Sequence, residues 1–141
     1  MSADKIFLDT NIIVYANDND DVQKRNISRE LIAGAFRGNS VTISFQVIQE
    51  YVNLATKSFK TKMSPEDCKL FIEQVLYPMC YVFPSIELYK QAIDISGRYQ
   101  YSFYDSMIIA AALQTDCKSL YTEDLQHGQK IEHLKIHNPY L

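Results

Sequence analysis

A short apolar run near the start of the chain, Ile6 to Leu8, constrains the fold more than any other stretch. It ends in the polar residues Asp9, Thr10 and Asn11, and apolar residues resume at position 12. A short apolar run closed by a polar turn is typical of a strand buried on both faces of a parallel sheet. Ligands of such sheets bind just beyond the carboxyl ends of the strands, where we expect Asp9. Aspartate after a strand is also a common helix N-cap, so Asp9 alone leaves both interpretations open.

The composition fits one domain with a full hydrophobic core. The chain has 141 residues, of which 47% are hydrophobic and 22% charged. The start carries Asp4 and Lys5, and no apolar run reaches membrane-spanning length, so we expect a cytoplasmic protein without a membrane anchor. Cys68, Cys80 and Cys117 are odd in number and show no C-x-x-C spacing, which favours buried free thiols over disulfides or a zinc site.

The net charge of −3 argues against a broadly basic nucleic-acid binder. The distribution of the charge matters more than its sum. If four carboxylates are gathered around a metal ion, 13 acids remain against 14 Lys and Arg, and the rest of the molecule is slightly basic. An acidic chain can therefore act on nucleic acid when its acids are concentrated at a metal site.

Strand and helix patterns alternate along the chain. After the first strand, short strands are predicted at 41–43, 81–83, 119–121 and 131–136. Helices are predicted at 22–36, at 45–59 after Ser44, from Ser64–Pro65 onward, from about 85 to 99, and through the apolar stretch 107–113. This alternation predicts an α/β fold over residues 1–141, with a parallel sheet of four to five strands and helices on both faces.

Two of these helices carry an acid on the side expected to face the core. Glu50 lies three residues after Val47 and four before Leu54, which would place it on the inner side of its helix. Asp105 lies three residues before Ile108 and four before Ile109, which would also place it on the core-facing side. A partly exposed flank or an ion pair would explain Glu50, and favourable interaction with the helix dipole would explain Asp105. The alternative to these separate explanations is a functional site in which Glu50 and Asp105 lie together.

Asp124 completes a set of four acids. It follows the predicted strand 119–121, so it and Asp9 would leave the sheet at the same edge, near Glu50 and Asp105. Four anions in one small site need a counter-charge, and oxygen ligands favour Mg²⁺ or Mn²⁺. His133 and His137 lie four residues apart but lack a third ligand nearby, which argues against zinc.

Hydrolysis of phosphodiester bonds is the chemistry that such a site supports. One divalent cation, or two roughly 3.5–4 Å apart, would lower the pKa of a bound water and stabilise charge on the scissile phosphate. No glycine-rich phosphate loop is present, and no G-x-S-x-G or paired Cys and His site stands out. Phosphatases with an aspartyl nucleophile commonly carry a second acid two residues later, whereas this chain has Asn11 there.

The sequence resembles PIN-domain proteins, and most of all the VapC-type toxins of bacterial toxin–antitoxin pairs. The resemblance rests on FLDTN, ISFQVIQEYVN, YSFYDSMIIAAAL and SLYTEDLQHG, which occur in the family's order along nearly the whole chain. It implies an endoribonuclease dependent on Mg²⁺ or Mn²⁺, an RNA substrate, frequent homodimers, and inhibition by a small antitoxin protein. The implied metal ligands and catalytic acids are Asp9, Glu50, Asp105 and Asp124, with Asn11 and Thr122 as polar supports. Glu123 adjoins Asp124, but the T-x-D spacing favours Asp124.

Other features leave alternatives open. The chain could be a PIN-fold RNA-binding or scaffold protein with little catalysis, although four clustered anions would then lack a purpose. Lys57, Lys60 and Lys62 could contact phosphates or simply lie at a solvated surface. The aromatic residues between 99 and 104 could stack on RNA bases, or belong to the core or a dimer surface.

Overall fold

The computed structural model describes residues 4–38 and 40–141, so residues 1–3 and 39 of the predicted domain lie outside the described part. A six-stranded sheet forms the centre, in the order β3-β2-β1-β4-β6-β5. Its strands are β1 (Ile6–Leu8), β2 (Val41–Ser44), β3 (Cys80–Val82), β4 (Ser119–Tyr121), β5 (Lys130–Ile131) and β6 (Leu134–His137). All neighbouring strands are parallel except β5 and β6. The predicted parallel α/β sheet is confirmed, with one strand more than expected.

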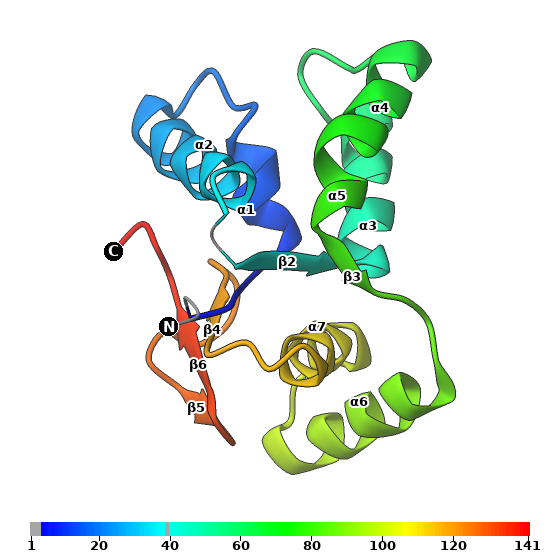
Figure 1. Cartoon of the computed structure of the whole chain (residues 1–141), viewed down its shortest axis with the longest axis vertical. Coiled ribbons are helices and arrows are strands. Elements are labelled where there is room, and N and C mark those ends of the chain that lie inside the picture. The colour runs from blue at the N-terminus through cyan, green and yellow to red at the C-terminus, as the bar shows by residue number, and fades with distance from the viewer. Residues whose placement is uncertain (1–3, 39) are drawn as a thin grey trace.

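Helices cover both sides of the strands (Figure 1). They are α1 (Thr10–Tyr15), α2 (Val22–Phe36), α3 (Phe45–Lys57), α4 (Pro65–Phe71), α5 (Tyr77–Met79), α6 (Ile86–Tyr99) and α7 (Phe103–Gln114), with a π-helical turn η1 (Ile72–Leu76) between α4 and α5. Figure 1 shows α6 and α7 together on one side of β2, and α1 and α2 on the other. Residues 106–113 of α7 are all buried, which confirms that this apolar helix is central.

The order of the strands creates the place where a site can form. The chain adds β2 and β3 on one side of β1, and later adds β4 on its other side. Loops that leave β1 and β4 therefore diverge at the carboxyl edge of the sheet, which is where open α/β sheets bind ligands. Phe7 and Leu8 in β1 and Leu120 in β4 are completely buried, so the central strands anchor this edge in the core.

Several predicted elements have different details in the structure. The last strand predicted at 131–136 is a hairpin of β5 and β6, turned by Glu132 with φ +53° and by His133. Sequence reasoning missed it because two-residue hairpin turns usually contain Asn or Gly. The third strand begins at Cys80, one residue earlier than predicted. Ile93 is apolar but 59% exposed, because Leu88, Ala92 and Ile95 form the buried stripe of α6.

The helix predicted from Ser64 is divided into α4, η1 and α5. Ser64 caps it as expected, because its side chain accepts a hydrogen bond from the backbone N–H of Asp67. Pro78 lies just beyond η1 and has no N–H to donate, and a wider π turn accommodates such an interruption. The three cysteines are free and buried, as predicted. In the described residues, no helix is both long enough and apolar enough to cross a membrane.

Candidate metal centre

Asp9 lies at the carboxyl end of the central strand β1 and is only 8% exposed. Its Oδ1 accepts a hydrogen bond of 2.7 Å from the backbone N–H of Thr10, so Asp9 is the N-cap of α1. Its Oδ2 accepts a hydrogen bond of 2.9 Å from the hydroxyl of Thr122, which follows β4. Both interpretations of Asp9 are therefore compatible: it caps a helix and also faces the loop that leaves the neighbouring strand.

Glu50 on α3 is exposed, and the prediction that it lies on the inner side of the helix was wrong. The buried stripe of α3 is Val47, Tyr51 and Ala55, and adjacent helical positions are about 100° apart. Glu50 therefore lies on the flank of the helix. Burial is the main cause that raises the pKa of its carboxyl group, and the nearby charges of Asp105 and Asp124 raise it further.

Asp105 and Asp124 come from the start of α7 and from the loop after β4. The hydroxyl of Ser102 caps α7 by accepting from the backbone N–H of Asp105, which lies in the first turn and is half-buried. Asp124 is exposed, and its backbone N–H donates to the hydroxyl of Thr122 at 3.1 Å. Thr122 thus connects Asp9 with the segment that carries Asp124.

The acids influence one another's protonation. Burial is the largest cause that raises the pKa of Asp9 to about 6, against the hydrogen bonds from Thr10 and Thr122, and the charges of Glu50 and Asp124 raise it further. Burial also raises the pKa of Glu50 and of Asp124, and Asp105 adds to both shifts. These charge effects place Glu50 and Asp124 near Asp9, and Asp105 near Glu50 and Asp124, at the carboxyl edge of the sheet.

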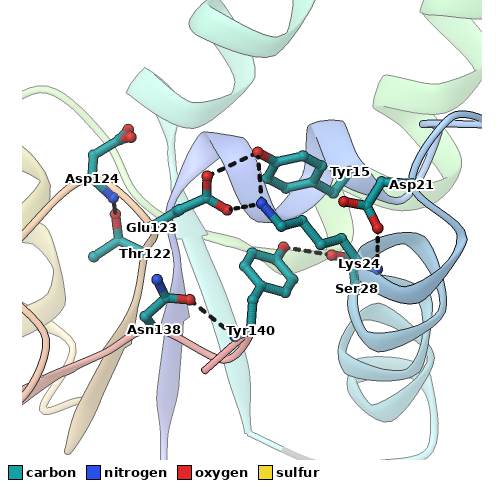
Figure 2. Close-up of polar contacts among 9 residues, drawn as sticks. All are labelled: Tyr15, Asp21, Lys24, Ser28, Thr122, Glu123, Asp124, Asn138 and Tyr140. Atoms are coloured by element: carbon teal, nitrogen blue, oxygen red, sulfur yellow. Dashed lines mark hydrogen bonds and ion pairs between the residues drawn. The ribbon is translucent and has the colours of Figure 1, made fainter.

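The neighbouring carboxylate Glu123 belongs to a different group of side chains. It accepts hydrogen bonds from the hydroxyl of Tyr15 at 2.9 Å and from Nζ of Lys24 at 2.8 Å. Figure 2 shows Glu123 extending toward these two residues while Asp124 extends the other way. In the described structure, Asp124 rather than Glu123 faces the acid cluster.

Buried polar atoms without hydrogen-bond partners surround the acids. Both polar atoms of the Asn11 amide lack a hydrogen-bond partner, although Asn11 lies near Asp124 and offsets part of the rise that burial causes in the pKa of that carboxyl group. The others at this edge are Thr10 Oγ1, Ser44 Oγ, Gln46 Oε1 and Ser106 Oγ. Ser44 was predicted to cap α3, but its side chain makes no capping hydrogen bond. Unpaired buried oxygens beside anions fit a site that binds a cation and its waters.

Sequence reasoning named Asn11 and Thr122 at this site but missed Thr10, Gln46 and Ser106. Thr10 directly follows Asp9, and Ser106 directly follows Asp105. Gln46 lies one helical turn before Glu50, and these spacings were the available signals in the sequence. The donor atoms suit Mg²⁺ or Mn²⁺, since all are oxygens. Within residues 4–38 and 40–141, however, no three acids or histidines lie close enough to form a ready set of metal ligands. Glu50 and Asp124 are the exposed members of the set.

The aromatic residues before Asp105 divide into two kinds. Tyr99, Tyr101 and Phe103 are partly buried and pack against the core. Tyr104 is 67% exposed, and its ring makes an edge contact with Phe103 at 5.5 Å between centroids. Only Tyr104 of these four is free to contact a ligand through most of its ring. Lys57, Lys60 and Lys62 are exposed, as a solvated surface requires.

Solved structures similar to this chain are bacterial toxin–antitoxin proteins. The VapBC2 complex of Rickettsia felis, bound to a promoter DNA fragment, matches 94% of this chain and 97% of its own at 21% identity and a TM-score of 0.64. Mycobacterium tuberculosis VapC20, described as a toxin that cleaves the sarcin–ricin loop, matches 85% and 90% at 18% identity and 0.64. The DNA-bound VapBC of Salmonella typhimurium matches 99% of both chains at 19% identity and 0.64. These identities establish a shared fold.

A comparison with protein families agrees with the structural likeness. Among curated proteins, none matches the sequence. The PIN domain family matches residues 6–130, a range that begins with β1 and contains all four acids. That range is most of the chain, and it confirms the resemblance seen in the sequence motifs. The chain belongs to the PIN-domain family.

Proposed function

We propose that this chain is a divalent-metal-dependent endoribonuclease, and the toxin of a toxin–antitoxin pair. The observation that carries the proposal is the convergence of four carboxylates from four separate segments at the carboxyl edge of the sheet. Burial is the main cause of the raised pKa values of Asp9, Glu50 and Asp124, and the charges of neighbouring acids, Asp105 among them, raise these values further, so a cation would relieve the repulsion. They are the proposed ligands of Mg²⁺ or Mn²⁺ and the proposed catalytic acids.

The proposed role of each residue in the site follows from whether its side chain is buried or exposed. Thr122 holds Asp9 through its hydroxyl and supports the backbone of Asp124, so it fixes the position of the buried ligand. Asn11 offers an unpaired amide to the same site. Glu50 and Asp124 are solvent-exposed, which makes them the candidates to orient the attacking water. A bound divalent cation supplies acidification of that water and charge stabilisation at the phosphate.

The open character of the site suits a polymer. Exposed Glu50 and Asp124 leave the acids accessible to a chain longer than a small molecule. Tyr104, one residue before Asp105, presents a ring on which an unpaired RNA base can stack. The similar toxin VapC20 is described as cleaving the sarcin–ricin loop, which supports RNA as the substrate class.

The proposal of an antitoxin partner rests on the proteins found in complex in the similar structures. Several are complexes of a toxin with its antitoxin, some of them on DNA. We expect a small antitoxin, encoded by a neighbouring gene, to bind this chain and suppress cleavage. A homodimer is the expected assembly, in line with the resemblance to VapC-type toxins.

A second function has one observation in its favour. The acids of the described residues do not form a ready set of metal ligands, which is what a PIN-fold RNA-binding or scaffold protein with little catalysis would show. Such a protein would bind RNA without cleaving it, whichever metal is supplied.

Cleavage of a structured RNA by the purified protein separates these functions. The assay compares Mg²⁺, Mn²⁺ and chelator for the wild type, Asp9→Asn and the exposed control Asp94→Asn on α6. We expect metal-dependent cleavage that the control retains and Asp9→Asn loses by at least about a hundredfold, because one ligand is removed without loss of core volume. RNA binding without cleavage, after mass spectrometry has excluded a co-purified antitoxin, would favour the scaffold.

A further inference from the structure

A second polar cluster lies next to the acids but is separate from them. Lys24 on α2 contacts Glu123 at 2.8 Å and approaches the hydroxyl of Tyr15 at 3.4 Å, while that hydroxyl donates to Glu123 at 2.9 Å. The hydroxyls of Tyr140 and Ser28 are hydrogen-bonded at 2.7 Å. Figure 2 shows these residues converging from α1, α2, the loop after β4 and the C-terminal segment.

Lys24 is held on several sides. Its ammonium lies 4.6 Å from the centroid of the Tyr15 ring and 5.2 Å from that of Tyr140. The two rings contact each other edge to face, with 5.2 Å between centroids. Cation–π contacts of this kind add to the ion pair with Glu123, and that hydrogen bond is the main cause of a raised pKa at Lys24. The ammonium therefore has one defined place in the fold.

This cluster holds the segment that carries Asp124. Glu123 is connected to Lys24 across 99 positions of sequence, and Thr122 on its other side is connected to Asp9. With residues 122 and 123 both held, the side chain of Asp124 extends away from Lys24 (Figure 2). The chain bends at residues 123–125, and with Glu123 held toward Lys24 the Asp124 side chain lies on the other side of this bend, toward the acids whose pKa values its charge raises.

We propose that Lys24 and Glu123 are a positioning pair that holds the 122–124 turn, so that Asp124 faces Asp9, Glu50 and Asp105. This role rests on the proposed function, since Asp124 needs a fixed direction only if it binds the metal. Side chains that hold metal ligands in place commonly change metal affinity or activity by roughly 10- to 100-fold when removed. The pair touches neither metal nor substrate.

The chain offers a matched control for this pair. Arg37 and Glu30 also form an ion pair, at 2.7 Å, but their side chains are 57% and 73% exposed and both belong to or adjoin α2. Lys24 and Glu123 are each 29% exposed and connect distant segments. An exposed pair within one helix contributes little to the position of any loop.

The test uses two double variants of the intact chain. Lys24→Met/Glu123→Met removes the positioning pair, and Glu30→Met/Arg37→Met removes the control pair. Each variant loses one positive and one negative charge, so the overall attraction for a cation stays the same. Methionine keeps side-chain length and packs well against the Tyr15 and Tyr140 rings. A change specific to the first variant therefore reports position rather than charge.

Two measurements are made well below the unfolding temperature. The first is Mn²⁺ affinity, followed by the electron paramagnetic resonance of the free ion. The second is the hydrogen-exchange rate of the Asp124 amide without metal, followed by NMR, because this amide donates to Thr122 in the ordered turn. We expect the first variant to bind Mn²⁺ at least about tenfold more weakly and to exchange the Asp124 amide faster. The control variant should match the wild type in both.

Unchanged Mn²⁺ affinity in Lys24→Met/Glu123→Met would overturn the positioning role, even if that variant unfolds at a lower temperature. Unchanged exchange at Asp124 would overturn it as well. If the wild type itself binds no Mn²⁺, the proposed function fails, and the exchange rates still decide separately whether the pair orders the turn.

Discussion

Asp9 shows how one residue can serve a helix and a site together. It caps α1 with one oxygen and receives the Thr122 hydroxyl with the other. Burial nevertheless raises its pKa to about 6, from an ordinary value of 3.8. The metal-free fold therefore carries an unfavourable anion near its centre at neutral pH, which is the expected property of a residue placed for a cation.

The stability of the metal-free protein should fall as the pH rises through this window. Because the folded pKa of Asp9 lies above the unfolded one, its protonation favours the folded state, fully below about pH 4 and no longer above about pH 6. The shift of the Asp9 pKa from 3.8 to about 6 corresponds to about 3 kcal/mol in the free energy of unfolding. With chelator present, Asp9→Asn should be more stable than wild type at pH 8, by up to that amount, and similar at pH 4.5. Denaturant unfolding of both proteins at pH 8 and pH 4.5 measures the difference in their stability. The same difference at the two pH values would contradict the prediction.

The residues of the candidate site were only partly predictable from the sequence. Asp9 and Asp124 follow strands, and the rule that ligands bind at the carboxyl edge of a parallel sheet places them without further information. The exposure of Glu50 was not predictable, because helical spacing cannot tell a buried stripe from its flank. The contact of Glu123 with Lys24 depends on residues 99 positions apart, which no local pattern reveals.

At the scale of elements, Tyr51 connects three of the helices that flank the site. It is completely buried on α3, one residue after Glu50. Its hydroxyl accepts a hydrogen bond of 2.6 Å from the amide of Asn17, just beyond α1. Its ring stacks on Phe71 of α4 at 4.9 Å between centroids. Tyr51 therefore fixes the position of the helix that carries Glu50.

Removing the hydroxyl of Tyr51 should cost stability without disturbing the core. Tyr51→Phe keeps the stacked ring but leaves the Asn17 amide without its partner, so we expect a loss of about 1 kcal/mol. Urea unfolding of Tyr51→Phe, Asn17→Ala and the double variant measures the coupling between the two residues. Losses that simply add in the double variant would show that the hydrogen bond does not contribute.

The elements themselves were more predictable than their irregularities. The helix at 22–36 and the strand at 119–121 have the bounds expected from apolar periodicity and turn residues. The β5–β6 hairpin and the η1 turn were missed for a shared reason. Each depends on a backbone conformation that the local residues permit but do not signal, namely a positive φ at Glu132 and a widened turn before Pro78.

At the scale of the whole molecule, strand order explains why distant acids meet. β1 lies between β2 and β4, so the segments that follow these strands leave from one edge. The alternation of strands and helices predicted a parallel sheet with Asp9 and Asp124 at one edge, but not the order of its strands. It could not predict that Glu50 and Asp124 would be exposed to solvent while Asp9 is buried. That difference depends on the packing around each side chain, which no local pattern in the sequence reveals.

The central claim is that four carboxylates from four segments form one binding site for divalent cations. Mn²⁺ affinity tests it most directly, measured for Asp9→Asn, Glu50→Gln, Asp105→Asn and Asp124→Asn beside the exposed control Asp94→Asn. Each of the four should weaken binding by at least about tenfold, because each removes an oxygen ligand and a charge, while the control should bind like the wild type. Wild-type affinity in any of the four would remove that acid from the centre, and absence of Mn²⁺ binding by the wild type would contradict the claim as a whole.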